Sequence, residues 1–472
     1  MFSDLRDAYF DSSTLNNVAG NFNVYHGNKD TVLNILKNHV AAGALHNSGE
    51  RFDSPKCHPG TRIAVLKKIG DWYRNKEAST PHVMWLYGAA GAGKSSIAQS
   101  MAEECHKLHT LAASFFFSRT APGRNNSNRL MATIAYQVAQ EISDTQPHIQ
   151  QAIEKDPMIF SKSMETQLHH LVVEPLLHLV NSNSSIDESW PKLFIIDGLD
   201  ECNGRETQQA IIHCFASALT QQTLPLYVLI SSRSEQPIRE VFSQPDRHWE
   251  YTPLVLDHEY QPDEDIALFL KANFSKIRST HALKGSLPET WPSDSDIEAL
   301  VQKSSGQFIF ASTVMRYIRS PRHQPIHRLE TILGLRRCGG PTPFAELDAL
   351  YMHILQATEE DQYDTIMRIF GLLVCKGSGF LTYRMDKQSE IEGFLNLEFG
   401  HIYLALADCY SIVHLPPPEA GKSQVIRFLH ASMSDFLLDP DRSHRFYLDQ
   451  GKVHADLVRA CIRGVGSLSK LF

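Results

Sequence analysis

A glycine-rich loop between an apolar strand and a helix constrains this chain more than any other feature. The loop consists of Gly88, Ala89, Ala90, Gly91, Ala92, Gly93, Lys94 and Ser95. Residues 83–87 before it are apolar and predict a buried strand, and residues 95–102 after it predict a helix. A strand, a glycine-rich loop ending in Lys-Ser and a helix, in that order, are the signature of a phosphate-binding P-loop.

The chemistry of such a loop follows from its backbone. Consecutive N–H groups surround a diphosphate, and the helix N-terminus adds positive dipole. We expect Lys94 to reach the terminal phosphates, Ser95 to hold Mg²⁺, and Ser96 to belong to the same phosphate-binding segment. A plain glycine-rich turn is the alternative, but it would not explain why Lys94 and Ser95 follow Gly93 directly.

Short apolar strands alternate with helices after the loop, which predicts a parallel sheet covered on both faces. The predicted strands are residues 83–87, 112–117, 193–197, 226–231 and 252–256. Helical patterns lie at residues 95–106, 129–142, 164–180 and 207–219. The predicted fold is therefore α/β, a three-layer P-loop NTPase domain followed by helical and winged-helix-like domains.

The domain boundaries come from changes in this pattern. We expect a flexible lead over residues 1–45 with a short helix near residues 31–40, and the P-loop nucleotide-binding domain over 46–257. Strand signals then fade, which predicts a helical domain over 258–340. After two prolines, helices and a strand at 425–429 predict a winged-helix-like domain over 341–472.

Acidic residues follow one of the predicted strands. Asp197 ends the apolar run 193–197, where its carboxylate would hold Mg²⁺ opposite Ser95. Asp200 and Glu201 come one short turn later, positioned to polarise a water against the terminal phosphate or to hold the waters around Mg²⁺. The alternative is a strand-end turn with solvated acids. With the P-loop upstream, the set predicts a magnesium nucleotide.

Arg233 follows another apolar strand and a pair of serines. A side chain at the C-terminal edge of a parallel strand faces the nucleotide crevice, so Arg233 could sense the γ-phosphate. An arginine capping a surface loop is the alternative.

These three motifs together resemble the NACHT family of STAND ATPases, which are signal-transducing switches. Residues 55–62, 115–119, 306–311 and 429–437 resemble the fungal subgroup related to the N-terminal region of nephrocystin-type proteins. The resemblance implies that Arg233 is the sensor arginine. It also implies that His430 touches the β-phosphate of ADP, and that Thr61 and Arg62 lie near the adenine. An imidazole can donate to a phosphate oxygen and is readily moved or reprotonated. The alternative for His430 is a histidine whose hydrogen bonds are satisfied within its own small domain.

The resemblance implies an ATP/ADP switch with slow Mg²⁺-dependent hydrolysis, in self/non-self or innate-immunity-like signalling, that self-associates when activated. Family members usually carry an effector domain and C-terminal repeats, and this sequence shows no pattern typical of either. The chain could therefore be a fragment or a minimal switch core. Two other functions also stay open. One is a conventional P-loop ATPase or small-molecule kinase, and the other is a nucleotide-stabilised interaction scaffold without turnover.

Composition narrows the classes of partner and the cellular locations that we expect. The chain has 472 residues, 42% of them hydrophobic, and a formal net charge of -8. We therefore expect no nucleic-acid partner. The N-terminus does not read as a signal peptide, and no apolar stretch reaches the roughly 18 residues of a membrane span. The eight cysteines lack the close spacing of a zinc or redox motif, so we expect a reducing, cytoplasmic location.

Overall fold

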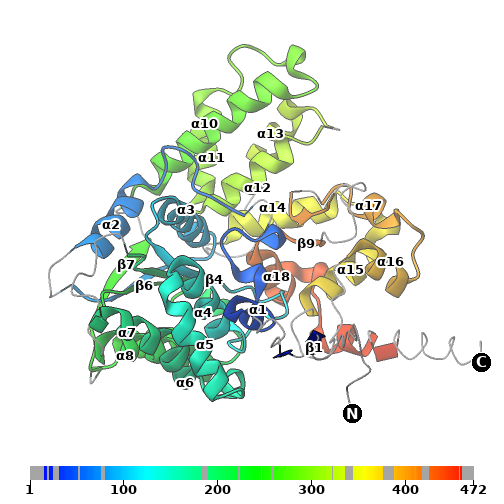
Figure 1. The fold of residues 1–472 in the computed structure, drawn as a ribbon. Coiled ribbons are helices and arrows are strands. Elements are labelled where there is room, and N and C mark those ends of the chain that lie inside the picture. Colours follow the sequence, from blue (N-terminus) through cyan, green and yellow to red (C-terminus); the bar gives the residue numbers. More distant parts are fainter. Residues whose placement is uncertain are drawn as a thin grey trace, which may run out of the picture.

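A computed structural model gives the fold (Figure 1). It describes residues 15–18, 21–24, 31–51, 54–75, 80–182, 190–221, 224–245, 247–256, 260–321, 323–334, 344–375, 387–409, 411–416, 425–456 and 458–459.

A five-stranded sheet of parallel strands forms the centre of the first half of the chain, in the order β4-β5-β6-β3-β7. Its strands are β3 (Val83–Gly88), β4 (Leu111–Phe116), β5 (Leu193–Asp197), β6 (Tyr227–Ser232) and β7 (Tyr251–Leu256). Each strand lies within one residue of its predicted bounds. The prediction of a three-layer P-loop NTPase fold is confirmed.

Alternation along the strands builds the three layers. In β3, Met84 and Leu86 pack into one core with α2 (Ile63–Arg74) and α3 (Lys94–Lys107). Val83 and Trp85 point to the opposite face and join a larger core. The other helices of this half are α1 (Val32–Lys37), α4 (Leu130–Glu141), α5 (Gln146–Lys155), α6 (Met164–Leu168), a π-helical segment (His169–Val173), α7 (Glu174–Ser182), α8 (Arg205–Gln221) and α9 (Gln236–Ser243).

The N-terminal lead contains α1, which is the short helix predicted near residues 31–40, and a hairpin that the sequence did not predict. The hairpin pairs β1 (Leu15–Val18) with β2 (Asn21–Val24) in antiparallel register. The rest of the predicted flexible lead before residue 31 lies outside the described residues.

The second half is helical (Figure 1). It is built on a hydrophobic core of its own. Its helices are α10 (Pro262–Thr280), α11 (Asp294–Ser304), α12 (Phe308–Ile318), α13 (Pro325–Gly334), α14 (Ala345–Gln356), α15 (Tyr363–Cys375), α16 (Gln388–Leu395), α17 (His401–Ala405), α18 (Ala431–Leu437) and α19 (Pro440–Ser443). The core runs from Ile266 to Leu448 and joins both predicted tail domains. The boundary predicted between them, near residue 341, lies outside the described residues.

The strand predicted at residues 425–429 is shorter than expected. β9 comprises only Arg427–Phe428 and pairs with β8 (Val413–His414) in antiparallel register. His430, still in extended conformation at φ -149° and ψ 146°, then caps α18. The winged-helix assignment of this region stays a prediction.

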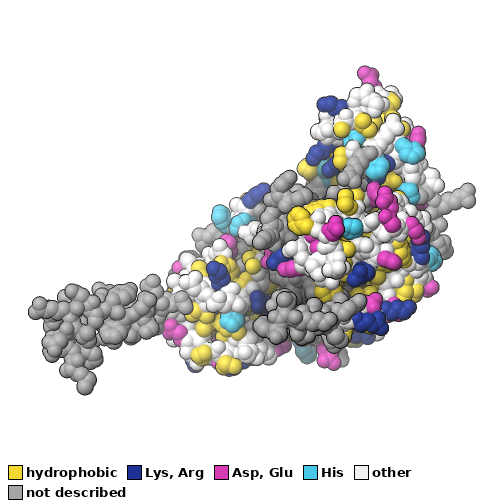
Figure 2. All heavy atoms as spheres, turned by 90° about the vertical axis from the view of Figure 1, so that its right-hand side faces the viewer, with side chains coloured by type: hydrophobic (Ala, Val, Ile, Leu, Met, Phe, Trp, Pro, Cys, Tyr) yellow, Lys and Arg dark blue, Asp and Glu magenta, His cyan; other side chains and the backbone are white. Residues whose placement is uncertain are grey.

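Both signs of charge are mixed on the surface. On the face shown in Figure 2, basic, acidic, histidine and hydrophobic side chains are interspersed. Within the described part of the chain, no helix has the length and apolar character needed to cross a membrane.

Candidate nucleotide-binding site

The P-loop connects the end of β3 to the start of α3. Gly91 and Gly93 adopt positive φ angles of 78° and 92°, a conformation that glycine takes without strain. The Lys94 ammonium donates hydrogen bonds to the carbonyl oxygens of Gly88 and Ala89, at 2.9 Å each. Burial lowers the pKa of Lys94, and the nearby carboxylate of Asp200 opposes that effect.

Asp197 ends β5 and is buried, as the sequence predicted for the position. The Ser231 hydroxyl donates a hydrogen bond to its carboxylate, and the Ser95 side chain forms another. Burial raises the pKa of Asp197 in spite of these bonds. The structure thus brings together Ser95 and Asp197, the pair predicted to hold Mg²⁺, and their oxygens are the ligand type that Mg²⁺ prefers.

Asp200 and Glu201 lie on a single 3-10 turn, Leu199–Glu201, which follows Gly198 at φ 70°. Glu201 accepts a hydrogen bond from the backbone N–H of Arg119 at 3.0 Å. Burial, reinforced by the charge of Asp200, raises the pKa of Glu201 to about 7. Asp200 instead pairs with Arg233, accepting its backbone N–H at 3.0 Å and contacting Nε at 3.2 Å.

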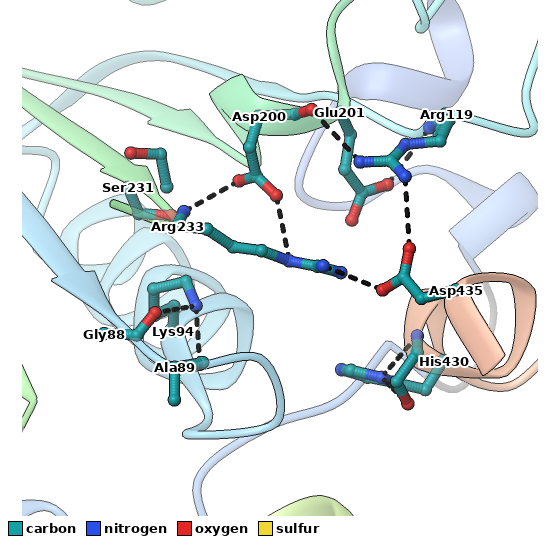
Figure 3. Close-up of polar contacts among 12 residues, drawn as sticks. Gly88, Ala89, Lys94, Arg119, Asp200, Glu201, Ser231, Arg233, His430 and Asp435 are labelled. Carbon is teal, nitrogen blue, oxygen red and sulfur yellow. Dashed lines mark hydrogen bonds and ion pairs between the residues drawn. The ribbon is translucent and has the colours of Figure 1, made fainter. Parts of the chain in front are cut away.

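Arg233 reaches from the end of β6 across to the helical half (Figure 3). Its Nη1 lies 2.7 Å from Oδ2 of Asp435, which is on α18. Arg119 approaches the same carboxylate from the segment after β4, with Nη1 3.2 Å from Oδ1. Arg233 is therefore paired between two carboxylates and is not a surface cap.

Sequence reasoning did not assign Arg119 or Asp435 to the site. Arg119 had a signal, because it follows β4 and the carboxyl ends of parallel strands share one edge of the sheet. Asp435 had none, since its partner Arg119 is 316 positions away in the sequence.

His430 caps the N-terminus of α18 and lies next to the same cluster (Figure 3). Its Nδ1 accepts the backbone N–H of Ser432 at 3.1 Å. Burial, followed by the charge of Arg233, lowers the pKa of His430 to about 4. The ring is therefore neutral at pH 7, and its contact with the β-phosphate stays a prediction.

A pocket of about 630 Å³ adjoins the loop at Gly93 and Ser96, and Thr61 and Arg62 are among its lining residues. The Arg62 guanidinium donates to the carbonyl oxygen of Ala92 at 3.0 Å. It also lies 4.9 Å from the ring centroid of Phe308. The segment before β3 thus lines a cavity beside the P-loop, where the resemblance placed the nucleotide base.

The helical half also touches the loop directly. The backbone N–H of Ile309, in the first turn of α12, donates to the carbonyl oxygen of Gly91 at 3.3 Å. A Cβ atom built at Gly91 would come within 2.1 Å of Cγ2 of Ile309. The helical half therefore contacts the loop through α12, and it contacts Arg119 and Arg233 through α18.

The fold and these residues define a P-loop nucleotide-binding architecture. Residues 60–233 match the family model described as "Nephrocystin 3, N-terminal". No curated protein matches the chain. Among solved structures, Drosophila ORC bound to DNA is 12% identical, with a TM-score of 0.36 over 82% of this chain and 96% of that chain. AMPPCP-bound DnaA from Aquifex aeolicus is 11% identical, with a TM-score of 0.26 over 72% and 99%.

One prediction about partners is corrected by these comparisons. The net charge of -8 was taken to exclude nucleic acid. The Drosophila ORC structure is bound to DNA. The exclusion was wrong, because the net charge of a whole chain does not determine the charge of a local binding surface.

Proposed function

We propose that this protein is an ATP/ADP-binding signal-transduction switch of the NACHT/STAND type, with slow Mg²⁺-dependent hydrolysis. The observation that carries the proposal is that Asp435, in the helical half, pairs with Arg119 and Arg233 beside the P-loop. The nucleotide site and the tail share charged groups, so the occupant of the site can bias the position of the tail. The match of residues 60–233 to a nephrocystin-type model supports the same class.

Each site residue has a role in this proposal. Lys94 exchanges the carbonyl oxygens that it now contacts for phosphate oxygens, and Ser95 and Asp197 hold Mg²⁺. Bound Mg²⁺ would neutralise charge on the terminal phosphates. Glu201, with Asp200 beside it, orients and deprotonates the attacking water.

The remaining residues recognise the nucleotide. Neutral His430 accepts on Nδ1, so its proton lies on Nε2, from which it can donate to the β-phosphate. Thr61 and Arg62 line the pocket proposed for the adenine. The signalling role, in self/non-self or innate-immunity-like responses, and the cytoplasmic location belong to the same proposal. The cysteines that the structure describes are free thiols, as a reducing compartment would keep them.

Nucleotide binding is tested by calorimetry with Mg·ADP and Mg·ATP. We expect Lys94→Ala to weaken both affinities by at least about tenfold, because it removes a charge-assisted contact to phosphate. Exposed Lys107→Ala, at the far end of α3, is the matched control and leaves them unchanged. Equal binding by wild type and Lys94→Ala would contradict the proposal.

Turnover separates the proposed switch from the two other functions. A switch hydrolyses ATP slowly and loses that activity in Glu201→Gln while it still binds nucleotide. Fast turnover would favour a conventional ATPase or kinase. Binding with no hydrolysis in the wild type would favour the scaffold.

A further inference from the structure

We propose that Arg119 and Arg233 form one anion site for the terminal phosphate of a nucleoside triphosphate, and that the Asp435 carboxylate competes for it. This inference rests on the proposed function and names the regulation of that site. It assigns a role to Arg119 and Asp435, to which the sequence alone gave none.

The geometry of the pair is that of a two-pronged anion receptor (Figure 3). Each arginine contributes one Nη1, and each Nη1 contacts a different oxygen of the Asp435 carboxylate, at 3.2 and 2.7 Å. The Asp435 side chain is 19% exposed, so these contacts are partly shielded from water. Guanidinium groups bind carboxylates and phosphates with the same planar donor arrangement.

Both arginines are anchored on the P-loop half independently of α18. Arg233 Nε contacts Asp200, and Arg119 Nη2 donates to the carbonyl oxygen of Asp200 at 3.4 Å. The backbone N–H groups of both arginines also bond to carboxylates, Arg119 to Glu201 and Arg233 to Asp200. The anion site would therefore remain formed if Asp435 moved away.

The site also lies next to the P-loop. β6 pairs with β3 so that Ser232, one residue before Arg233, is opposite Tyr87, one residue before Gly88. Burial is the main cause of the lowered pKa of Lys94, and the charge of Arg233 acts in the same direction, so the two side chains lie within electrostatic range of each other. A phosphate group bound by Lys94 would thus have the two arginines as its neighbours.

Competition follows from charge. Two anions cannot share one pair of cations without strong repulsion at these separations. A triphosphate would place a terminal phosphate at the arginines, whereas a diphosphate lacks that group. Docking of Asp435 is therefore compatible with ADP and incompatible with ATP.

The consequence reaches the whole helical half because α18 is part of its core. Phe436 is fully buried there, and Ser432 forms a hydrogen bond of 2.8 Å with the Tyr351 hydroxyl of α14. The N–H of Leu448 donates to the carbonyl oxygen of Leu437. Displacing Asp435 from the arginines must move these packed elements with it.

The test compares affinities for Mg·AMPPNP and Mg·ADP in the full chain. We expect Asp435→Asn to raise the affinity for Mg·AMPPNP about tenfold and to change that for Mg·ADP less than about twofold. Exposed Asp441→Asn, on α19, controls for loss of one negative charge from the same region. Adding Arg119→Ala to Asp435→Asn should abolish the gain, because the triphosphate then loses one of its two arginines.

Hydrogen exchange tests the contact without any nucleotide. In Asp435→Asn, backbone amides of residues 431–438 should exchange faster than in the wild type and in Asp441→Asn. Unchanged exchange there, or an equal gain in affinity for both nucleotides, would overturn the inference. Faster exchange in a protein that binds neither nucleotide would overturn the proposed function and leave the Asp435 contact standing.

Discussion

The two acids after β5 occupy different electrostatic environments although they are adjacent in sequence. Asp200 is buried beside the guanidinium of Arg233, which offsets its charge. Glu201 has a backbone N–H of Arg119 as its hydrogen-bond donor, and its pKa rises to about 7. In the proposed function, this difference favours Asp200 as the residue that holds Arg233 in place and Glu201 as the proton acceptor near neutral pH.

The raised pKa of Glu201 has a consequence for stability that needs no nucleotide. Since Glu201 ionises at a higher pH in the folded chain than its ordinary value of 4.5, the folded state holds an extra proton between pH 4.5 and about 7. Its contribution to stability therefore falls as the pH rises through that window. We expect the change in melting temperature caused by Glu201→Gln to be more positive at pH 8 than at pH 5, by about 2 °C or more.

Differential scanning fluorimetry at the two pH values measures this effect. Exposed Glu289→Gln is the control and should shift the melting temperature equally at both. If Glu201→Gln also gave the same shift at pH 5 and pH 8, the raised pKa would be contradicted.

At the scale of elements, the sequence predicted the sheet well and the tail less well. The strands of the sheet are buried on both faces, so each appears as a continuous apolar run with clear ends, as in residues 193–197. The hairpin β1-β2 was missed, and no helix was predicted at α5, α9, α13, α16, α18 or α19. The hairpin at β8-β9 pairs only two residues per strand, too few for a periodic pattern to define its ends.

The same limit applies to the candidate site. The motifs around Lys94, Asp197 and Arg233 are local, and the sequence placed them all at one edge of the sheet. Asp435 and Ile309 reach that edge only through the packing of the helical half. Contacts of this kind depend on how the helical half packs against the P-loop half. A short sequence motif carries no information about that packing.

The contact between α12 and the P-loop gives a prediction at the element scale. Gly91 and Gly93 both have positive φ, but only Gly91 has a neighbour within 4 Å of an added Cβ, namely Ile309. Gly91→Ala should therefore destabilise the protein by about 1–3 kcal/mol more than Gly93→Ala, because it adds a steric clash to the shared backbone strain. Chemical denaturation without nucleotide measures the difference.

Removing the neighbour provides the control. Ile309→Ala deletes Cγ2, so the double variant with Gly91→Ala should cost less than the sum of the two single changes. Strict additivity would show that Ile309 does not contact the loop in solution.

At the scale of the whole molecule, apolar burial is divided between two halves. The cores on the two faces of the sheet contain residues up to Leu256, and the core of the helical half begins at Ile266. Between the halves, the contacts at the nucleotide site are polar or small, such as Asp435 with Arg233 and Ile309 with Gly91. This arrangement suits a switch, since polar contacts can be exchanged for ligand contacts without opening a core.

Two halves with separate cores, joined by such contacts, should unfold in two calorimetric transitions. We expect Mg·ADP at about 100 times its dissociation constant to stabilise the transition of the P-loop half by about 2.7 kcal/mol. The transition of the helical half should move with it only while Asp435 is paired, so Asp435→Asn should separate the two transitions further. A single transition that Mg·ADP shifts equally in wild type and Asp435→Asn would mean that the halves are coupled through contacts other than the Asp435 pair.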